Sequence, residues 1–251
     1  MMSLLLKMLK NFDKTQMEDL GFRYKKNRFY RMYGRAFQTI EFQPSCICYD
    51  NFQIFIGMSF LSGIIKNHQG GYTFYEFTGE NYQQTPGHVD ELYFDRDSQE
   101  NTNTVFANIF DQIEKRVVPL LDQIKDENSF LEMGERAARG EHTFFYTFTR
   151  PHYYYLYAIC GRFDKAIEIL SNLIEGHIDS AEQNHQYFIR EKMPERAEEV
   201  LQNQRYFMKE SKIIMDALKK RNTEFFNILA EFNGYDNADY LWKTYKIKIP
   251  E

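Results

Sequence analysis

Few residues in this chain have the types and spacing that catalysis or metal binding requires. Cys46 and Cys48 lie two positions apart, so on a strand they would face the same side and offer two thiolates to a metal. No further His or Cys ligand lies near them in the sequence, which favours two small packed side chains. Cys160 with His142 or His152 could form a nucleophile–base pair, but no family signature surrounds these residues.

A second polar stretch contains a spacing that can bind metal on a helix. His177, Asp179, Glu182 and His185 lie close together, but the HExxH arrangement is absent. A solvated helix face is the favoured interpretation. Glycine-rich phosphate loops are also absent. The sequence therefore predicts no catalytic, cofactor-binding or metal-binding residue.

The charge layout is the strongest signal for an interface. Six basic residues without an acid among them fall within 13 residues: Arg23, Lys25, Lys26, Arg28, Arg31 and Arg35. Seven acidic residues, opposed only by one arginine, fall within 25 residues: Glu76, Glu80, Asp90, Glu91, Asp95, Asp97 and Glu100. Two such runs can steer a partner electrostatically. Alternatively they face each other, or are a solvated hairpin and loop.

Composition limits the classes of partner and the compartment. The net charge of −5 disfavours nucleic acid, although the basic run is interleaved with aromatic residues that can stack on bases. Three cysteines are too few for a disulfide scaffold and fit a reducing compartment. No apolar run approaches the ~18 residues of a membrane span. We expect a cytoplasmic protein that does not enter the membrane.

Hydrophobic periodicity changes sharply along the chain and predicts an α+β fold. A helix over 3–19, ended by Gly21, precedes short alternating segments. These predict an antiparallel meander of about five strands, because no helix intervenes between them. The strands are expected at 22–24, 28–33, 37–43, 52–60 and 72–77, with a short strand at 91–94 inside a loop over 78–101.

From Thr104 onward the apolar spacing is helical. Pro119 is expected to kink the first helix, and Ser129 with Glu132 forms a predicted capping box for the next. Further helices are expected at 153–160, 165–175, 180–190, 195–220, 223–233 and 238–245, with Gly161 and Gly176 as two of the stops. The predicted domains are an α+β domain over 1–125 and a helical bundle or hairpin appendage over 126–251.

Residues 20–31, read as LGFRYKKNRFYR, resemble a bacterial family known as domain of unknown function 4304. That family has a leading helix, a Leu-Gly-Phe step, a basic stretch, an aromatic pair and a strand ending in Gln, which here is Gln43. The resemblance covers roughly residues 3–125. It implies an α+β fold without an established activity. Proteins of this kind are similar to the small acidic immunity proteins found beside bacterial toxins.

Residues 155–167 are similar to the inner turn of a tetratricopeptide repeat. The small residues Ala158 and Ala166 would let two antiparallel helices approach, with Gly161 at the turn. No second copy occurs at a spacing near 34 residues, whereas a repeat array needs about three units. A lone helical hairpin is the favoured interpretation.

Three hypotheses for function follow. The first is a non-enzymatic interaction protein, an immunity-type binder of a toxin whose contact surface is the acidic run of residues 76–100. The second is a ligand binder or enzyme with an aromatic pocket between sheet and helices. Its candidate lining is Tyr30, Gln43, Tyr153, Tyr154, Tyr155 and Tyr157. The third is a helical scaffold in which residues 141–251 offer a groove to a peptide.

Overall fold

The chain divides into two units, Met1–Thr147 and Phe148–Glu251. The predicted boundary lies at residue 125. The observed boundary, after Thr147, lies further along the chain and keeps helix α5 (Glu127–Ala138) with the sheet. The Phe130 ring of α5 packs against the Phe60 ring of the sheet at 5.4 Å between centroids. The computed structural model describes residues 9, 14–44, 51–60, 82–83, 91–93, 99–141, 153–229 and 243–246.

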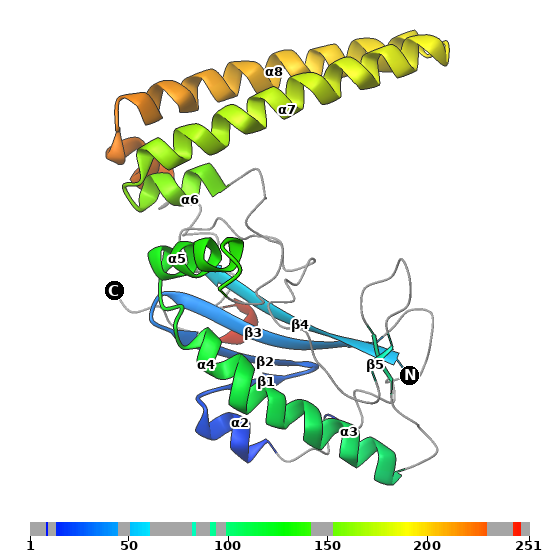
Figure 1. The fold of residues 1–251 in the computed structure, drawn as a ribbon, viewed down its shortest axis with the longest axis vertical. Helices are drawn as coiled ribbons and strands as arrows, with labels where there is room; N and C mark the ends of the chain where they lie inside the picture. Colours follow the sequence, from blue (N-terminus) through cyan, green and yellow to red (C-terminus); the bar gives the residue numbers. More distant parts are fainter. Residues whose placement is uncertain are drawn as a thin grey trace. The chain divides into compact units, whose positions relative to one another are not determined.

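The first unit is built on an antiparallel sheet. Its strands are β1 (Arg23–Lys25), β2 (Arg28–Tyr33), β3 (Ala36–Pro44), β4 (Asn51–Phe60), β5 (Tyr82–Gln83) and β6 (Glu91–Tyr93). They form one six-stranded sheet in the order β1-β2-β3-β4-β6-β5 (Figure 1). The predicted α+β class is confirmed, as is the antiparallel meander over β1–β4. β6 matches the predicted short strand and β5 was not predicted, whereas the predicted strand 72–77 lies outside the described residues.

One face of the sheet packs against helix α3 (Gln99–Gln112) through aromatic rings. The Phe110 ring lies 5.6 Å from Phe29 and 5.8 Å from Phe42, and the Phe106 ring lies 5.7 Å from Phe52. All five rings are buried. Each buried phenylalanine contributes ~2 kcal/mol through apolar burial, so this cluster fixes the helix on the sheet.

The helix departs from regular α-helical geometry where the sequence predicts a kink. α3 continues into a π-helical turn, η1 (Ile113–Val117), and then into α4 (Val118–Leu121). Pro119 has no N–H to donate to the preceding turn, so the regular ladder cannot run through it. The π-turn directly before the proline accommodates this missing bond.

The first two hairpins of the meander turn through residues with positive φ. Lys26 has φ +63° in the β1–β2 turn, at the predicted place. Gly34 has φ +58° in the β2–β3 turn, where it approaches the backbone after α4. A Cβ on Gly34 would lie 2.5 Å from the Lys125 carbonyl oxygen, and the adjacent Arg35 N–H donates to the same oxygen at 2.6 Å. The turn therefore requires a glycine.

Helix α2 (Thr15–Asp19) ends at Gly21, as predicted. The Gly21 N–H donates to the Glu18 carbonyl and the Phe22 N–H to the Met17 carbonyl, each at 2.9 Å. This is the Schellman arrangement, and the buried side chains of Met17 and Phe22 supply its hydrophobic contact. Of the predicted helical residues 3–13, only Leu9 is described, and it is helical and buried.

The predicted capping box of α5 is displaced by one helical turn. Asp126, not Ser129, is the N-cap: its carboxylate accepts the Ser129 N–H at 2.8 Å, and the Asp126 N–H donates to the Ser129 hydroxyl at 3.0 Å. Ser129 therefore occupies the third helical position, where the prediction placed Glu132. Burial raises the pKa of Asp126, but the two hydrogen bonds from Ser129 outweigh it and hold the pKa below its usual value.

The second unit consists of helices, among them α6 (Tyr153–Ile159), α7 (Phe163–Arg190) and α8 (Pro194–Lys219). α6 ends at Gly161, which has φ +74°. The Gly161 N–H donates to the Ala158 carbonyl at 2.9 Å, and the Arg162 N–H to the Tyr157 carbonyl at 2.8 Å. The predicted helical hairpin around this turn is confirmed by the packing of α6 against α7.

α7 is one helix where the sequence predicts two. The prediction ends a helix at Gly176, but α7 continues through this residue to Arg190. Glycine costs about 1 kcal/mol relative to alanine inside a helix. The apolar face of α7 continues on both sides of Gly176, and its packing against α8 outweighs that cost.

α8 begins at Pro194, in the first helical position that suits proline. A further helix covers residues 223–229, and the Asn222 side-chain oxygen caps it by accepting the Phe225 N–H at 3.1 Å. Within the described residues, no helix combines the length and the apolar character that a membrane span needs.

Candidate functional site

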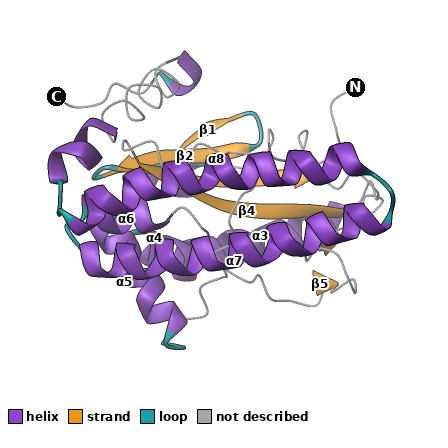
Figure 2. Ribbon diagram, turned by 90° about the horizontal axis from the view of Figure 1, so that it is seen from above, coloured by secondary structure: helices purple, strands orange, loops and turns teal. Residues whose placement is uncertain are grey.

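α7 and α8 form an arm of two antiparallel helices (Figure 2). The residues between the helices recur every seven positions, which is the spacing of a coiled coil. On α7 these buried or half-buried residues are Phe163, Leu170 and His177, with Ile167, Ile174, Ala181 and Phe188. On α8 they are Ala197, Gln204, Ser211 and Leu218, with Val200, Phe207 and Ile214.

Three seam positions near the middle of the arm are polar. The His177 ring contacts the Phe207 ring at 4.0 Å between centroids with a tilt of 38°, and among the described residues its buried Nε2 has no hydrogen-bond partner. Gln204 and Ser211 occupy seam positions of α8 that an apolar residue usually takes. The middle of the arm therefore gains less stability from apolar packing than a uniformly apolar seam would provide.

One flank of the seam is covered by α6. Ala166 and Ala217 are buried on this flank. Burial raises the pKa of Tyr154 on α6, and the nearby negative charge of Glu210 on α8 raises it further. α6 therefore lies beside the Glu210 side of the arm.

The opposite flank carries an apolar stripe, formed by Ile178 of α7 and Leu201, Met208 and Met215 of α8. The three α8 residues are seven positions apart, so they lie in one line beside the seam. Met208 is 36% exposed, and the other three are half-buried. Ile189, which is 52% exposed, extends the apolar surface toward the tip.

Charged rims of opposite sign border the apolar stripe. The acidic rim runs along α7 and consists of Glu168, Glu175 and Glu182, all exposed. The basic rim runs along α8 and consists of Arg205, Lys212 and Lys219, all exposed. Both rims repeat every seven residues, so each is parallel to the stripe.

Two rim residues already have neighbours on their own helix. Glu168 pairs with Lys165 at 2.6 Å, and Arg205 pairs with Glu198 at 3.7 Å. All four side chains are more than 40% exposed, so these pairs contribute little and can exchange for others. The apolar stripe with its two rims can bind an amphipathic helical surface whose charges oppose those of the rims.

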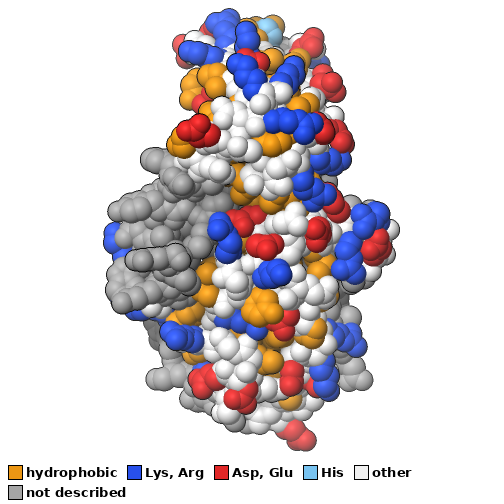
Figure 3. Space-filling view, turned by 90° about the vertical axis from the view of Figure 1, so that its left-hand side faces the viewer, with side chains coloured by type: hydrophobic (Ala, Val, Ile, Leu, Met, Phe, Trp, Pro, Cys, Tyr) orange, Lys and Arg blue, Asp and Glu red, His pale blue; other side chains and the backbone are white. Residues whose placement is uncertain are grey.

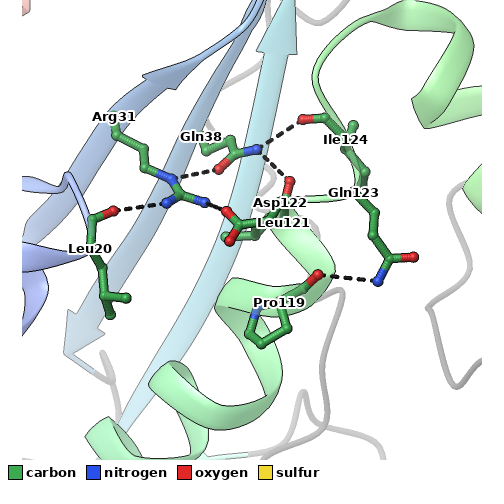
Figure 4. Close-up of polar contacts among 8 residues, drawn as sticks. All are labelled: Leu20, Arg31, Gln38, Pro119, Leu121, Asp122, Gln123 and Ile124. Carbon is green, nitrogen blue, oxygen red and sulfur yellow. Dashed lines mark hydrogen bonds and ion pairs between the residues drawn. The ribbon is translucent and has the colours of Figure 1, made fainter.

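In contrast to the arm, the first unit contains a buried polar network around Arg31 and Gln38 (Figure 4). The Arg31 side chain is 7% exposed, and its guanidinium pairs with Asp122. It also donates to the Gln38 side-chain oxygen at 2.9 Å and to the Leu20 carbonyl at 2.8 Å. The Gln38 amide donates to the Leu121 and Ile124 carbonyls at 2.7 and 3.0 Å. The network ties β2 and β3 to the ends of α2 and α4 and is structural.

The predicted acidic contact surface is only partly described. Glu100 is exposed in the first turn of α3, and Glu91 lies in β6. Glu76, Glu80, Asp90, Asp95 and Asp97 lie outside the described residues. This surface stays a prediction.

Half of the predicted basic run is neutralised within the first unit. Arg28 pairs with Glu41, Arg31 with Asp122, and Arg35 with Glu127 at 3.4 Å. These acids come from β3 and from the segments around α4 and α5, not from the acidic run. Charges of both signs are intermixed on the face shown in Figure 3.

The predicted pocket residues come from both units. Tyr30 and Gln43 lie on the sheet face opposite α3, because their neighbours Phe29 and Phe42 contact that helix. Tyr154, Tyr155 and Tyr157 belong to α6, where the last two are buried. Tyr153 is the first residue of the same helix. A pocket that joins these residues stays a prediction.

The candidate nucleophiles and metal ligands do not gather among the residues that the structure covers. Cys46, Cys48, His142 and His152 lie outside the described part, and Cys160 is half-buried at the end of α6. His177 faces the seam, while Asp179 and Glu182 are exposed. Within the described ranges, no three His, Cys, Asp or Glu side chains could hold a metal ion together.

Comparison with protein-family models, with curated proteins and with solved structures found no match for this chain.

Sequence reasoning identified several apolar residues of α8 but missed the apolar stripe. The signal was present as the seven-residue spacing of Leu201, Met208 and Met215. This spacing is hard to recognise because Gln204 and Ser211, two neighbouring seam residues, are polar and interrupt the apolar pattern of α8.

Proposed function

We propose that this chain is a protein-binding protein and that the α7–α8 arm provides its contact surface. The observation that carries the proposal is the apolar stripe between two rims of opposite charge. Met208, Ile189 and Met193 are 36%, 52% and 43% exposed along an arm whose seam is polar near its middle. Exposed apolar surface rimmed by charges marks interaction sites in soluble proteins.

The third hypothesis from the sequence, a helical scaffold that binds a helix or peptide, is the closest to this geometry. An amphipathic helix laid along the stripe would contact apolar residues in the centre and a complementary charge on each side. Exposed Met208 and half-buried Met215 suit such a surface, because their flexible thioether side chains adapt to a partner.

The biological role that we propose is neutralisation of a bacterial toxin by binding. Its support is the resemblance of residues 20–31 to the family named above and the net charge of −5. Co-expression with the toxic product of a neighbouring gene should restore growth. Failure to restore growth, together with failure to co-purify, would remove this role while leaving the arm as a binding surface.

A photo-activatable residue tests the contact surface directly. Placed at Met208 in the full chain, it should cross-link to another protein chain in the native cell. The matched control is Asn203, an exposed residue of α8 on the flank opposite the apolar stripe. Equal cross-linking from both positions, or none from Met208, would refute the proposed contact surface.

A further inference from the structure

The register of the two rims identifies a partner for the apolar stripe. His177 faces Phe207, and Asp164 pairs with Arg221 at 3.0 Å, so the alignment of α7 against α8 is fixed at two points. Counting residues along both helices from the contact of His177 with Phe207, each acidic residue lies within ~4.5 Å, along the arm, of one basic residue. The pairs at matching height are Glu182 with Arg205, Glu175 with Lys212 and Glu168 with Lys219.

Within one arm these pairs lie on opposite sides of the apolar stripe. A two-fold axis along the arm would place α7 of one copy over α8 of another without changing height. Each acidic rim would then face a basic rim at the matching height. Side chains of both helices lean toward their own N-termini, and because the helices are antiparallel this brings each pair closer together.

We propose that the arm binds the arm of a second copy of this chain, in parallel, as a four-helix bundle. This inference rests on the proposed function, because it names the partner of the same surface. The antiparallel alternative, with α7 over α7, would place acidic rim against acidic rim and is disfavoured by like-charge repulsion. The apolar stripes of the two copies would form the centre of the interface.

The size of the surface is sufficient for a stable dimer. An arm of 28 helical residues is about 40 Å long, and two packed helices are about 20 Å wide. That face covers about 800 Å², which is the area that each partner buries in a stable interface. The arrangement is isologous, as in most homodimers.

Charge exchange in the full chain tests the proposal. One variant carries Glu175→Lys and Glu182→Lys, and the other carries Arg205→Glu and Lys212→Glu. All four positions are exposed and all the residues favour helix, so circular dichroism should be unchanged. In sedimentation analysis the wild type should be dimeric, and each variant alone should self-associate at least about tenfold more weakly.

An equimolar mixture of the two variants should restore the dimer, because every rim then faces its opposite. A wild type that is monomeric at all concentrations, variants that still dimerise, or a mixture that stays monomeric would each overturn the parallel arrangement. The cross-link from position 208 separates the two proposals. Capture of a different protein by a monomeric chain would refute self-association and preserve the binding function, whereas no capture and no dimer would refute both.

Discussion

The sheet unit and the helical arm use polar residues in opposite ways. In the sheet unit, Arg31 and Gln38 are buried in a network of hydrogen bonds to each other and to the Leu20, Leu121 and Ile124 carbonyls. In the arm, His177 is half-buried, and its buried Nε2 has no hydrogen-bond partner among the described residues. The first arrangement specifies one packing, because breaking it exposes several groups without partners. The second arrangement stabilises the packing of the arm less, so the arm is more suited to binding a partner.

The largest expected effect is the loss of stability of the sheet unit when the glycine of the β2–β3 turn is replaced. Gly34→Ala should destabilise that unit by about 4 kcal/mol, because it combines a positive φ with a clash against the Lys125 carbonyl. The control is Gly140→Ala, where φ is +77° and no atom lies within 4 Å of the new Cβ. The control should cost about 1 kcal/mol, as measured by chemical denaturation. Equal costs would show that the turn does not dock tightly.

A second pair of substitutions contrasts the two units directly. Gln38→Leu should destabilise the sheet unit by about 3 kcal/mol, because the Arg31 Nε–H and two carbonyls lose their partner. Gln204→Leu in the seam should instead stabilise the arm by about 1 kcal/mol through added apolar burial. Hydrogen exchange resolved by segment measures both. The same sign of change in both units would contradict the contrast.

Acid should weaken the sheet unit through the N-cap of α5. The pKa of Asp126 is lowered on folding, so its stabilising contribution is present above the unfolded pKa near ~3.9 and is lost as pH falls through the folded value. Asp126→Asn keeps a capping side chain and should cost about 1 kcal/mol or less at neutral pH. The difference in unfolding free energy between wild type and variant should shrink below pH ~4. A difference that is independent of pH would refute the role of the carboxylate.

The smallest expected effect concerns the interior of α7. Gly176→Ala should stabilise the arm by about 0.5–1 kcal/mol, because Gly176 is exposed and nothing lies within 4 Å of the added Cβ. Thermal unfolding followed by circular dichroism measures this change. A loss of stability would show that this position needs the flexibility of glycine.

The sequence predicts most of the fold where one local signal acts without a competitor. Gly21 and Gly161 end helices as expected, and the alternating residues of β4 predict a strand. Gly176 misleads because tertiary packing of α7 on α8 outweighs a local preference. Ser129 misleads because Asp126, three residues earlier, offers a competing cap that only the geometry distinguishes.

The candidate binding surface is harder to predict because it depends on the register between two helices. The glutamates of α7 and the basic residues of α8 look like ordinary solvated faces when each helix is considered alone. Their match in height follows from the contact of His177 with Phe207. No local pattern contains that information.

The short connection at the tip of the arm limits how such an arm can change during evolution. α7 and α8 are joined through Glu191, Lys192 and Met193, with Lys192 held at φ +58° by bonds back to α7. A connection this short cannot accommodate an insertion in one helix that is not matched in the other. Descendants can lengthen or shorten the arm only by gaining or losing seven-residue blocks in both helices together, so such protein arms should differ in length by whole heptads.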